Sequence, residues 1–397
     1  MAIPLLPPEI ILQILEAGYF NHKFRPDRYF LNSCCRVCRA WLAQAQPLLF
    51  RHVEVRSPSS LAGLNEALTR PRHGKNALQE VVLWLRIWIG FSESVSSPAA
   101  LSSLLTTCSN LYGLSVTFRD MWTLPEEPPI LPPNILALEC CDWEYKLGPE
   151  IARILIRSGW HSLRILIIRG YPSLHEISPN LAELRVVERS TVSTSLHEAL
   201  TFLRPQLNLR ILEITPYPKF VPLLELSQHS LESVQMLECM SPMHLKCCHR
   251  LREFKVETPI SQELFQILRD LPLEHLAYAV LPTWYTKDFS KECVSLSPAL
   301  KVVSCLTSIR PWNEGMTKYI DDLEYICNKK HVRLEYFTTL VSFRALTVCM
   351  VSDHLVLIYV NTVHLREDPS SRPTHFLVNS WFRTIRDCES SADFHTL

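Results

Sequence analysis

The sequence predicts an α/β protein in which a short three-helix module at the N-terminus precedes a long, irregular array of parallel strands and helices. Apolar residues recur at helical spacing through the first part of the chain, and a short apolar phrase recurs beyond residue 75. We therefore expect four parts. They are the helical module at 1–55, a connecting helix or linker at 56–77, the repeated body at 78–339, and an atypical C-terminal segment at 340–397 that is either a cap or a partly disordered tail.

The composition defines the class of protein. Of the 397 residues, 47% are apolar, which allows a large core and argues against general disorder. The 40 basic and 40 acidic residues cancel, so the chain lacks the basic excess of a typical nucleic-acid-binding protein. Arg344, Asp353 and His354 interrupt the longest apolar stretch, which makes a membrane-spanning helix unfavourable. The first residues make a poor signal peptide, so we expect an intracellular protein of the cytoplasm, the nucleus or both.

Glycine is rare in this chain. Only nine glycines occur, and no two lie closer than eleven positions apart. A Walker A loop, a dinucleotide-binding turn, a kinase Gly-rich loop and a GxSxG elbow all need closely spaced glycines, because the backbone must approach phosphate or turn sharply. The sequence therefore excludes these motifs, and we expect no cofactor.

The N-terminal module begins with an apolar helical stripe formed by Ile10, Ile11, Ile14 and Leu15. Gly18 is suited to end this helix, residues 21–28 predict a loop, and Pro47 predicts the start of a third short helix. Between them lies a second apolar stripe, made of Leu31, Cys34, Cys35, Cys38, Trp41, Leu42 and Ala45. Three short helices bury little core alone, so such a module often needs a partner surface. The alternative is an ordinary helical cap on a larger domain.

Three motifs follow one another in this module. They are Leu6-Pro7-Pro8-Glu9-Ile10, Cys35-Arg36-Val37-Cys38-Arg39-Ala40-Trp41 and Pro47-Leu48-Leu49-Phe50. In this order they resemble the F-box. The resemblance implies docking onto the Skp-type adaptor of cullin–RING ubiquitin ligases, and it implies no catalysis. By position, the residues that match the adaptor-binding face are Leu6, Pro7, Pro8, Ile10, Ile14, Val37, Cys38 and Trp41.

The body of the chain repeats one phrase: apolar, two residues, apolar, one residue, apolar. Its copies begin at Leu78, Leu111, Leu163, Leu181, Leu209, Leu231, Leu251, Leu273 and Leu300. The last two apolar positions alternate, so they face one side of a short strand, and segments such as 150–158 and 262–270 predict helices between strands. This pattern predicts a parallel sheet in which no single repeat can bury its apolar face alone.

The phrase and its period resemble leucine-rich repeats, which implies a solenoid. F-box modules are often followed by such repeats. The asparagine that usually follows the phrase is replaced here, for example by Tyr171 and Pro259, so we expect an irregular array. Five prolines at 120–133 predict an inserted loop. The alternative is a generic α/β domain.

Polar residues alternate with the buried apolar ones along the predicted strands. They would line the exposed face of the sheet, where a target protein is most easily bound. The alternative is an ordinary solvated sheet face. The candidates are Arg169, Glu183, Arg185, Glu213, Gln235, Glu253, Lys255 and Glu257.

Metal and catalytic sites are less well supported. Cys35-x-x-Cys38, Cys140-Cys141 and Cys247-Cys248-His249 lack the second matched pair that structural zinc needs, so no metal is expected. No local signature selects a catalytic pair among the 14 cysteines and 15 histidines, which leaves a cysteine hydrolase as a third hypothesis. Trp84 and Trp88, four residues apart, predict core or cap residues, and the alternative is an aromatic platform for a ligand.

Together these features predict the substrate-recognition subunit of a Skp–cullin–F-box ubiquitin ligase, which is not itself an enzyme. The helical module would hold the adaptor, and the repeated body would hold a target protein of unknown identity. Holding a target lysine near a charged ubiquitin carrier raises the effective concentration of the reactants. No nucleic acid or membrane partner is expected. The alternative is a leucine-rich-repeat scaffold that acts outside a ubiquitin ligase.

Overall fold

The computed structural model divides into two compact units, residues 1–49 with 336–397, and residues 50–335. The structure describes residues 6–19, 26–69, 78–90, 98–119, 131–141, 154–159, 161–169, 180–187, 208–214, 221–236, 242–256, 260–279, 287–306, 314–337, 345–351, 354–360 and 381–384. Among the helices in these ranges, none is both long enough and apolar enough to cross a membrane.

The first unit begins with three helices, α1 (Pro8–Ala17), α2 (Arg28–Cys35) and α3 (Arg39–Arg51). Asp27 caps α2, because its Oδ1 accepts a 2.9 Å hydrogen bond from the backbone N–H of Phe30. The expected boundaries of the second and third helices were wrong. The second stripe is divided by a turn at 36–38, and Pro47 lies inside α3 instead of starting a helix. Near the helix end, Pro47 removes only one backbone hydrogen bond.

These helices share a small core of their own. It consists of Ile11, Leu15, Tyr19, Leu31, Cys34, Ala45 and Leu48. The single stripe expected on α1 is therefore two stripes, because Ile11 and Leu15 point inward while Ile10 and Ile14 are exposed. Gly18 ends α1 as expected, and a Cβ atom there would lie 2.5 Å from the Phe30 ring. Glycine thus lets α2 pack closely against the end of α1.

The C-terminal segment contains a separate antiparallel sheet. Its strands are β13 (Ala345–Val351), β14 (His354–Val360) and β15 (Trp381–Thr384), paired in that order. The described part of 340–397 therefore does not continue the parallel array.

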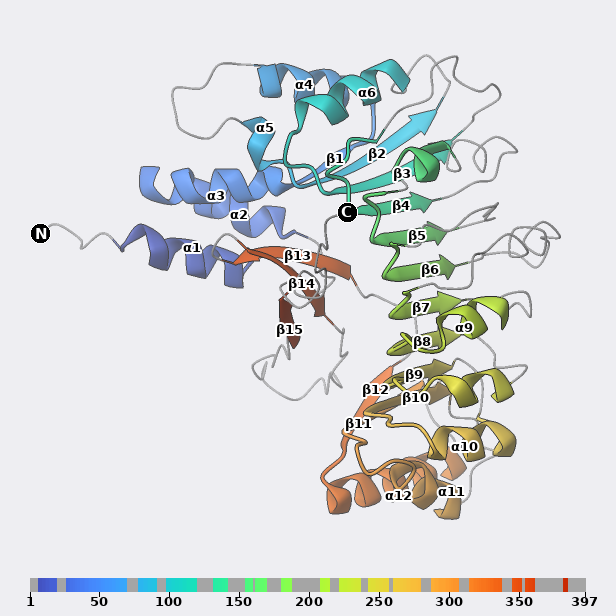
Figure 1. The fold of residues 1–397 in the computed structure, drawn as a ribbon. Coiled ribbons are helices and arrows are strands. Elements are labelled where there is room, and N and C mark those ends of the chain that lie inside the picture. The colour runs from blue at the N-terminus through green and yellow to red at the C-terminus, as the bar shows by residue number, and fades with distance from the viewer. Residues whose placement is uncertain are drawn as a thin grey trace, which may run out of the picture. The chain divides into compact units, whose positions relative to one another are not determined.

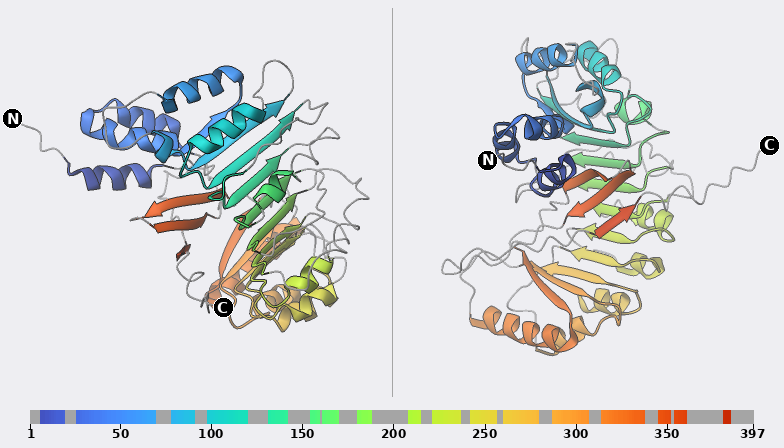
Figure 2. Two further views of the ribbon diagram at one scale, coloured as in Figure 1. Left: turned by 45° about the horizontal axis from the view of Figure 1, so that its top comes forward. Right: turned by 90° about the vertical axis from the view of Figure 1, so that its left-hand side faces the viewer.

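The second unit is built on a twelve-stranded sheet whose strands follow one another in sequence order (Figures 1 and 2). The strands are β1 (His52–Val55), β2 (Trp84–Gly90), β3 (Gly113–Arg119), β4 (Ala137–Cys141), β5 (Ile165–Arg169), β6 (Glu183–Val187), β7 (Ile211–Ile214), β8 (Ser233–Met236), β9 (Glu253–Val256), β10 (His275–Ala279), β11 (Val302–Leu306) and β12 (Arg333–Phe337). All are parallel, which confirms the α/β class.

Helices connect many of the strands. The described helices are α4 (Pro58–Thr69), α5 (Leu78–Val81), α6 (Pro98–Thr107), α9 (Val221–Ser227), the 3-10 helix η2 (Pro242–Cys247), α10 (Gln262–Arg269), α11 (Lys287–Val294) and α12 (Glu314–Lys330). Helices α9, α10 and α11 lie on one side of the strands (Figure 1). The helix expected at 262–270 is confirmed, and it starts at the cap Ser261. Of the helix expected at 150–158, residues 154–158 are described and helical.

The repeated phrase is aligned from strand to strand. Leu114 pairs with Leu138, which pairs with Leu166, and all three are buried. The copy expected at Leu78 was wrong, because α5 occupies 78–81 and β2 starts at Trp84. By register, the phrase on β2 begins at Val82, and the sequence analysis missed further copies that begin at Phe50 and Ile135. The sheet therefore starts at His52, earlier than the expected boundaries at 55 and 78.

Side-chain hydrogen bonds join successive turns of this array at the residue just before the phrase. The amide of Asn134 donates to the carbonyl oxygens of Ser109 at 2.7 Å and Leu111 at 2.6 Å. At the equivalent place, Asn180 donates to the carbonyl of His161, and Ser230 to that of Leu209. These bonds satisfy carbonyl groups between successive repeats. Tyr171, Pro259 and residues 120–130 lie outside the described residues.

Candidate docking surfaces

The helical module exposes two groups of apolar residues, one at and just before α1 and one between Val37 and Leu42. We call these residues together the apolar face, and they are Leu6, Pro7, Pro8, Ile10, Ile14, Val37, Cys38 and Leu42. The exposed fraction is 40% for Ile10 and for Ile14, and 61% for Val37. Seven of the eight residues expected to bind the adaptor lie on this face. Trp41, the eighth, is partly buried and packs against the module's own core.

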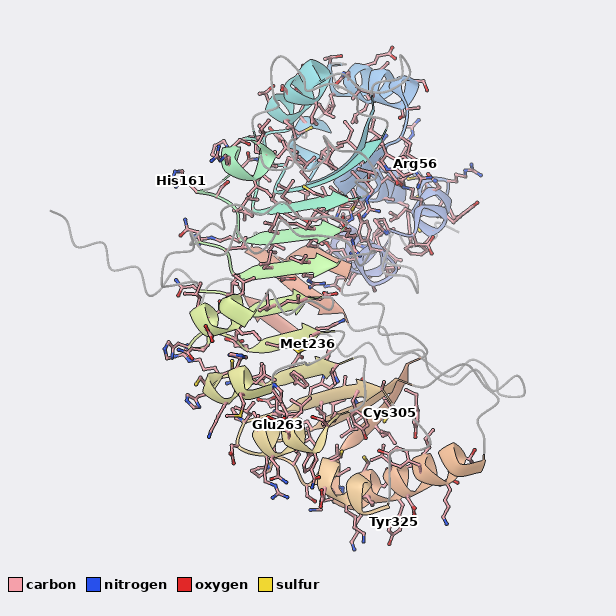
Figure 3. The ribbon with its side chains drawn as sticks, turned by 90° about the vertical axis from the view of Figure 1, so that its right-hand side faces the viewer. Arg56, His161, Met236, Glu263, Cys305 and Tyr325 are labelled. Atoms are coloured by element: carbon pink, nitrogen blue, oxygen red, sulfur yellow. The ribbon has the colours of Figure 1, made fainter. Side chains whose placement is uncertain are left out.

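The twelve-stranded sheet carries a second surface. Residues that alternate with the core positions form its polar face, and register places one of them from each strand in a continuous row. From β1 to β11 this row is Glu54, Arg86, Ser115, Glu139, Ile167, Arg185, Glu213, Gln235, Lys255, Ala277 and Ser304. Figure 3 views the same unit from the side of α10 and α12, which are marked by Glu263 and Tyr325.

Glu139 is the centre of the first ionic network on the polar face. Its Oε1 accepts a 2.8 Å hydrogen bond from Nε of Arg169, and its Oε2 accepts bonds from Ser115 at 2.8 Å and Arg86 at 3.2 Å. Burial alone would raise the pKa of this carboxyl. The two arginines, with the hydrogen bonds from Arg169 and Ser115, lower that pKa to about 2. Glu139 is therefore charged across the physiological range.

The next network has the opposite composition. Arg185 donates from Nε to Oε1 of Glu183, and the same nitrogen lies 3.7 Å from Oε2 of Glu213. All three side chains are almost fully buried. Two arginines share one glutamate in the first network, whereas two glutamates share one arginine in the second. Such buried charges need these partners, since an isolated buried charge is very costly.

A third network crosses β9 to β12. Nε2 of His275 lies 2.6 Å from Oγ of Ser304, which donates to Glu335 at 3.2 Å, and Nδ1 of His275 lies 3.9 Å from Glu253. Burial lowers the pKa of His275. A serine, a histidine and a glutamate in line suggest acyl transfer. Ser304 is buried, however, and the backbone of these inner strands is paired on both sides, so no oxyanion donors stand free there. The arrangement fits a structural polar network.

The structure separates the eight residues expected to bind a target. Arg185, Glu213, Gln235 and Lys255 share the row described above. Glu183 and Glu253 lie in the neighbouring row, and Arg169 lies at the end of β5. Glu257 lies outside the described residues. Arg169 is 36% exposed, whereas Glu183, Arg185 and Glu213 are nearly inaccessible.

The sequence analysis missed the aromatic part of the polar face. Trp84 and Trp88 alternate with the buried Leu85 and Ile87 on β2, so both indoles lie beside Arg86 on the polar face. Both are partly buried there, outside the row of apolar core positions, and Trp84 packs against His52 and Tyr112. A helical spacing of four was assumed, but in a strand residues four apart also share a face. If the phrase is placed at Val82 instead of Leu78, the sequence itself puts Trp84 and Trp88 on the face opposite the core.

Several buried cysteines are unreactive in character. Burial raises the pKa of Cys108 and Cys248 to about 11 and that of Cys327 to about 12. It also raises the pKa of Cys140 and Cys293. A thiol must ionise to act as a nucleophile, so none of these favours a cysteine hydrolase. Within the described ranges, no three His, Cys, Asp or Glu side chains gather as metal ligands would.

Comparison with known proteins adds no assignment. The sequence matches no model of a protein family, and it matches no curated protein.

Proposed function

We propose that this protein is the substrate-recognition subunit of a Skp–cullin–F-box-type ubiquitin ligase. In this proposal the helical module binds the adaptor, and the parallel sheet with its helices is a degenerate leucine-rich-repeat solenoid that binds the target. The protein then supplies position and contributes no catalytic group.

The observation that carries the proposal is the apolar face of the helical module. Leu6, Ile10 and Ile14 follow one another at helical spacing at and before α1 and are all exposed, and soluble proteins rarely leave such a continuous apolar stripe without a partner. Here the face carries Ile10, Ile14 and Val37, while a different set of residues builds the module's core. These exposed side chains therefore contribute little to the module itself and are available to another protein.

The order of motifs supports the identity of that partner. The residues that resemble the adaptor-binding positions of an F-box lie on the apolar face, with the exception of the partly buried Trp41. Ile10, Ile14 and Val37 are accordingly the expected anchors, since buried aliphatic side chains dominate such contacts. Trp41 would act mainly by holding α3 in place.

The test is recovery of a Skp-type adaptor and cullin with the full-length protein after co-expression. The decisive variant is Ile10→Glu combined with Val37→Glu, because both side chains are exposed and their loss should leave folding intact. Two buried charges should weaken adaptor binding about a hundredfold or more. Tyr29→Glu is the matched control, since Tyr29 is an exposed aromatic residue of the same module outside the apolar face.

Three outcomes decide the proposal. Adaptor recovered with wild type and Tyr29→Glu, and lost with the double variant, supports it. Equal recovery with the double variant overturns it. If wild type recovers other proteins but never the adaptor, the protein is a repeat scaffold outside a ubiquitin ligase. Thermal melting of each variant shows whether folding is unchanged.

A further inference from the structure

The first network of the polar face leaves its arginines accessible. There the side chains of Arg86 and Arg169 keep exposed fractions of 37% and 36%. In the second network Glu183, Arg185 and Glu213 are nearly inaccessible. Among the described residues of these two networks, a partner can therefore reach the arginines of the first network and not the charges of the second.

These two arginines have hydrogen-bond donors to spare. Among the described residues, Arg169 bonds only through Nε, to Glu139, and Arg86 bonds only through Nε and Nη2. Both Nη groups of Arg169 and Nη1 of Arg86 therefore remain for a ligand. A guanidinium pairs with a carboxylate through parallel N–H groups. Because Glu139 already fixes both side chains, binding costs little additional side-chain entropy.

Aromatic side chains lie beside the arginines. Trp84, Arg86 and Trp88 lie along the same face of β2. The guanidinium of Arg56, labelled in Figure 3, lies 5.6 Å from the centroid of the Trp88 ring. The ring of Trp84 packs edge-on against Tyr112 at 6.1 Å between centroids. Tryptophan and arginine are the residues that most often carry binding energy at protein interfaces.

The charge of this cluster selects its ligand. Arg86 and Arg169 contribute two positive charges and Glu139 one negative charge, which leaves one positive charge. Each carboxylate oxygen of Glu139 accepts a hydrogen bond from an arginine, so this carboxylate does not repel an acidic ligand as an unpaired one would. Carboxylates of a partner are thus complementary to the free N–H groups, and its apolar atoms are complementary to the indoles.

We propose that Trp84, Arg86, Trp88 and Arg169 form a docking site for an acidic segment of the target protein, bound through its carboxylates. This inference rests on the proposed function, because it names the class of target that the receptor selects. The site is confined to β2–β5, and the second and third networks stabilise the sheet.

The experiment uses the full-length protein and a short fluorescein-labelled peptide with a central run of glutamates in a glycine and serine background. Fluorescence anisotropy measures its binding. Binding should weaken as salt rises and should fall about tenfold in Arg169→Gln. A peptide with glutamines in place of glutamates should bind at least tenfold more weakly. A third peptide carries phosphoserines in place of the glutamates.

Arg333→Gln is the matched control. Arg333 is also partly exposed and also donates to a buried glutamate, at 2.8 Å to Glu335, but it lies on β12. It should bind the glutamate peptide like wild type. Because Arg169→Gln removes a partner of buried Glu139, a second variant changes Glu139, Arg86 and Arg169 to glutamine together. It leaves no unpaired charge, and it should lose binding as well while melting as one folded unit.

Equal loss of binding in Arg333→Gln and Arg169→Gln overturns the site. Equal binding of the glutamine peptide overturns the role of carboxylates, and binding of the phosphoserine peptide alone assigns the site to phosphate groups instead. No binding of any peptide also overturns it. Adaptor recovery is measured separately on the apolar face. Peptide binding without adaptor recovery would therefore refute the ligase role and leave the docking site standing.

Discussion

Arg169 on β5 donates a 2.8 Å hydrogen bond from Nε to Oε1 of Glu139 on the adjacent strand β4. The other carboxylate oxygen accepts from Arg86 and Ser115, so three side chains from β2, β3 and β5 converge on one buried charge. Side chains therefore connect β2, β3 and β5 to Glu139 on β4, whereas backbone hydrogen bonds join only adjacent strands. It also aligns the two arginines on which the proposed docking site depends.

The first prediction concerns the stability of this network as the pH changes. The pKa of Glu139 is lowered from 4.5 to about 2 in the folded protein. Between these values the unfolded chain binds a proton that the folded chain does not, so the contribution is complete above about pH 4.5 and is lost as the pH falls towards 2. We expect Glu139→Gln to lower the unfolding free energy at neutral pH by about 3 kcal/mol.

Urea unfolding of wild type and Glu139→Gln, followed by circular dichroism at several pH values, measures this effect. The difference between the two proteins should shrink steadily below pH 4.5. Glu263→Gln is a suitable control, since Glu263 is an exposed residue of α10, and it should stay close to wild type throughout. A difference that does not change with pH would show that the carboxylate stabilises the sheet by packing alone.

The sequence contains enough information for the parallel sheet but not for its polar face. Copies of the phrase beginning at Leu163, Leu181 and Leu209 fall on strands because leucines at the first two core positions leave a clear pattern. The copy at Ile135 ends in Cys140, and the one at Phe50 has valines, so neither stands out by composition. The position of each strand, and hence which charges meet, depends on register that only the assembled sheet defines.

The same limit applies to the helical module. The spacing of Ile10, Ile11, Ile14 and Leu15 predicts a helix but cannot separate its inward from its outward apolar residues, because neighbouring positions differ by only about a third of a turn. The role of Trp41 was likewise undetermined, since its motif fits both an interface residue and a core residue. Only packing against α1 and α2 distinguishes these roles.

The two proposed surfaces depend on different forces. Binding at the apolar face is driven by the removal of aliphatic surface from water, so its affinity should change little with salt. The arginine cluster acts through exposed charges, and its binding should weaken markedly as salt rises. Salt therefore separates adaptor binding from target binding in one protein, which makes the two proposals independently measurable.

The second prediction tests the division of α1 into an inward and an outward stripe. Leu15 is fully buried in the module's core, whereas the adjacent Ile14 is 40% exposed. Leu15→Ala should destabilise the module by about 2–5 kcal/mol, because it leaves a cavity. Ile14→Ala should cost less than about 1 kcal/mol. Thermal melting of both variants in the full-length protein compares them directly, and similar losses would contradict the assignment of the apolar face.

The third prediction concerns Gly113, the first residue of β3. A Cβ atom at this position would lie 2.0 Å from a ring carbon of Trp84, closer than any real contact, so glycine is what lets the indole lie across β3. Gly113→Ala must displace Trp84 or separate β2 from β3, and we expect the unfolding free energy to fall by about 1–3 kcal/mol.

Gly63 offers the opposite case. It lies within α4, and a Cβ atom there would meet nothing within 4 Å. Gly63→Ala should therefore stabilise the protein by about 0.5–1 kcal/mol, because alanine favours a helix over glycine. Urea unfolding of the two variants measures both effects, and a neutral Gly113→Ala would mean that Trp84 does not occupy the polar face as described.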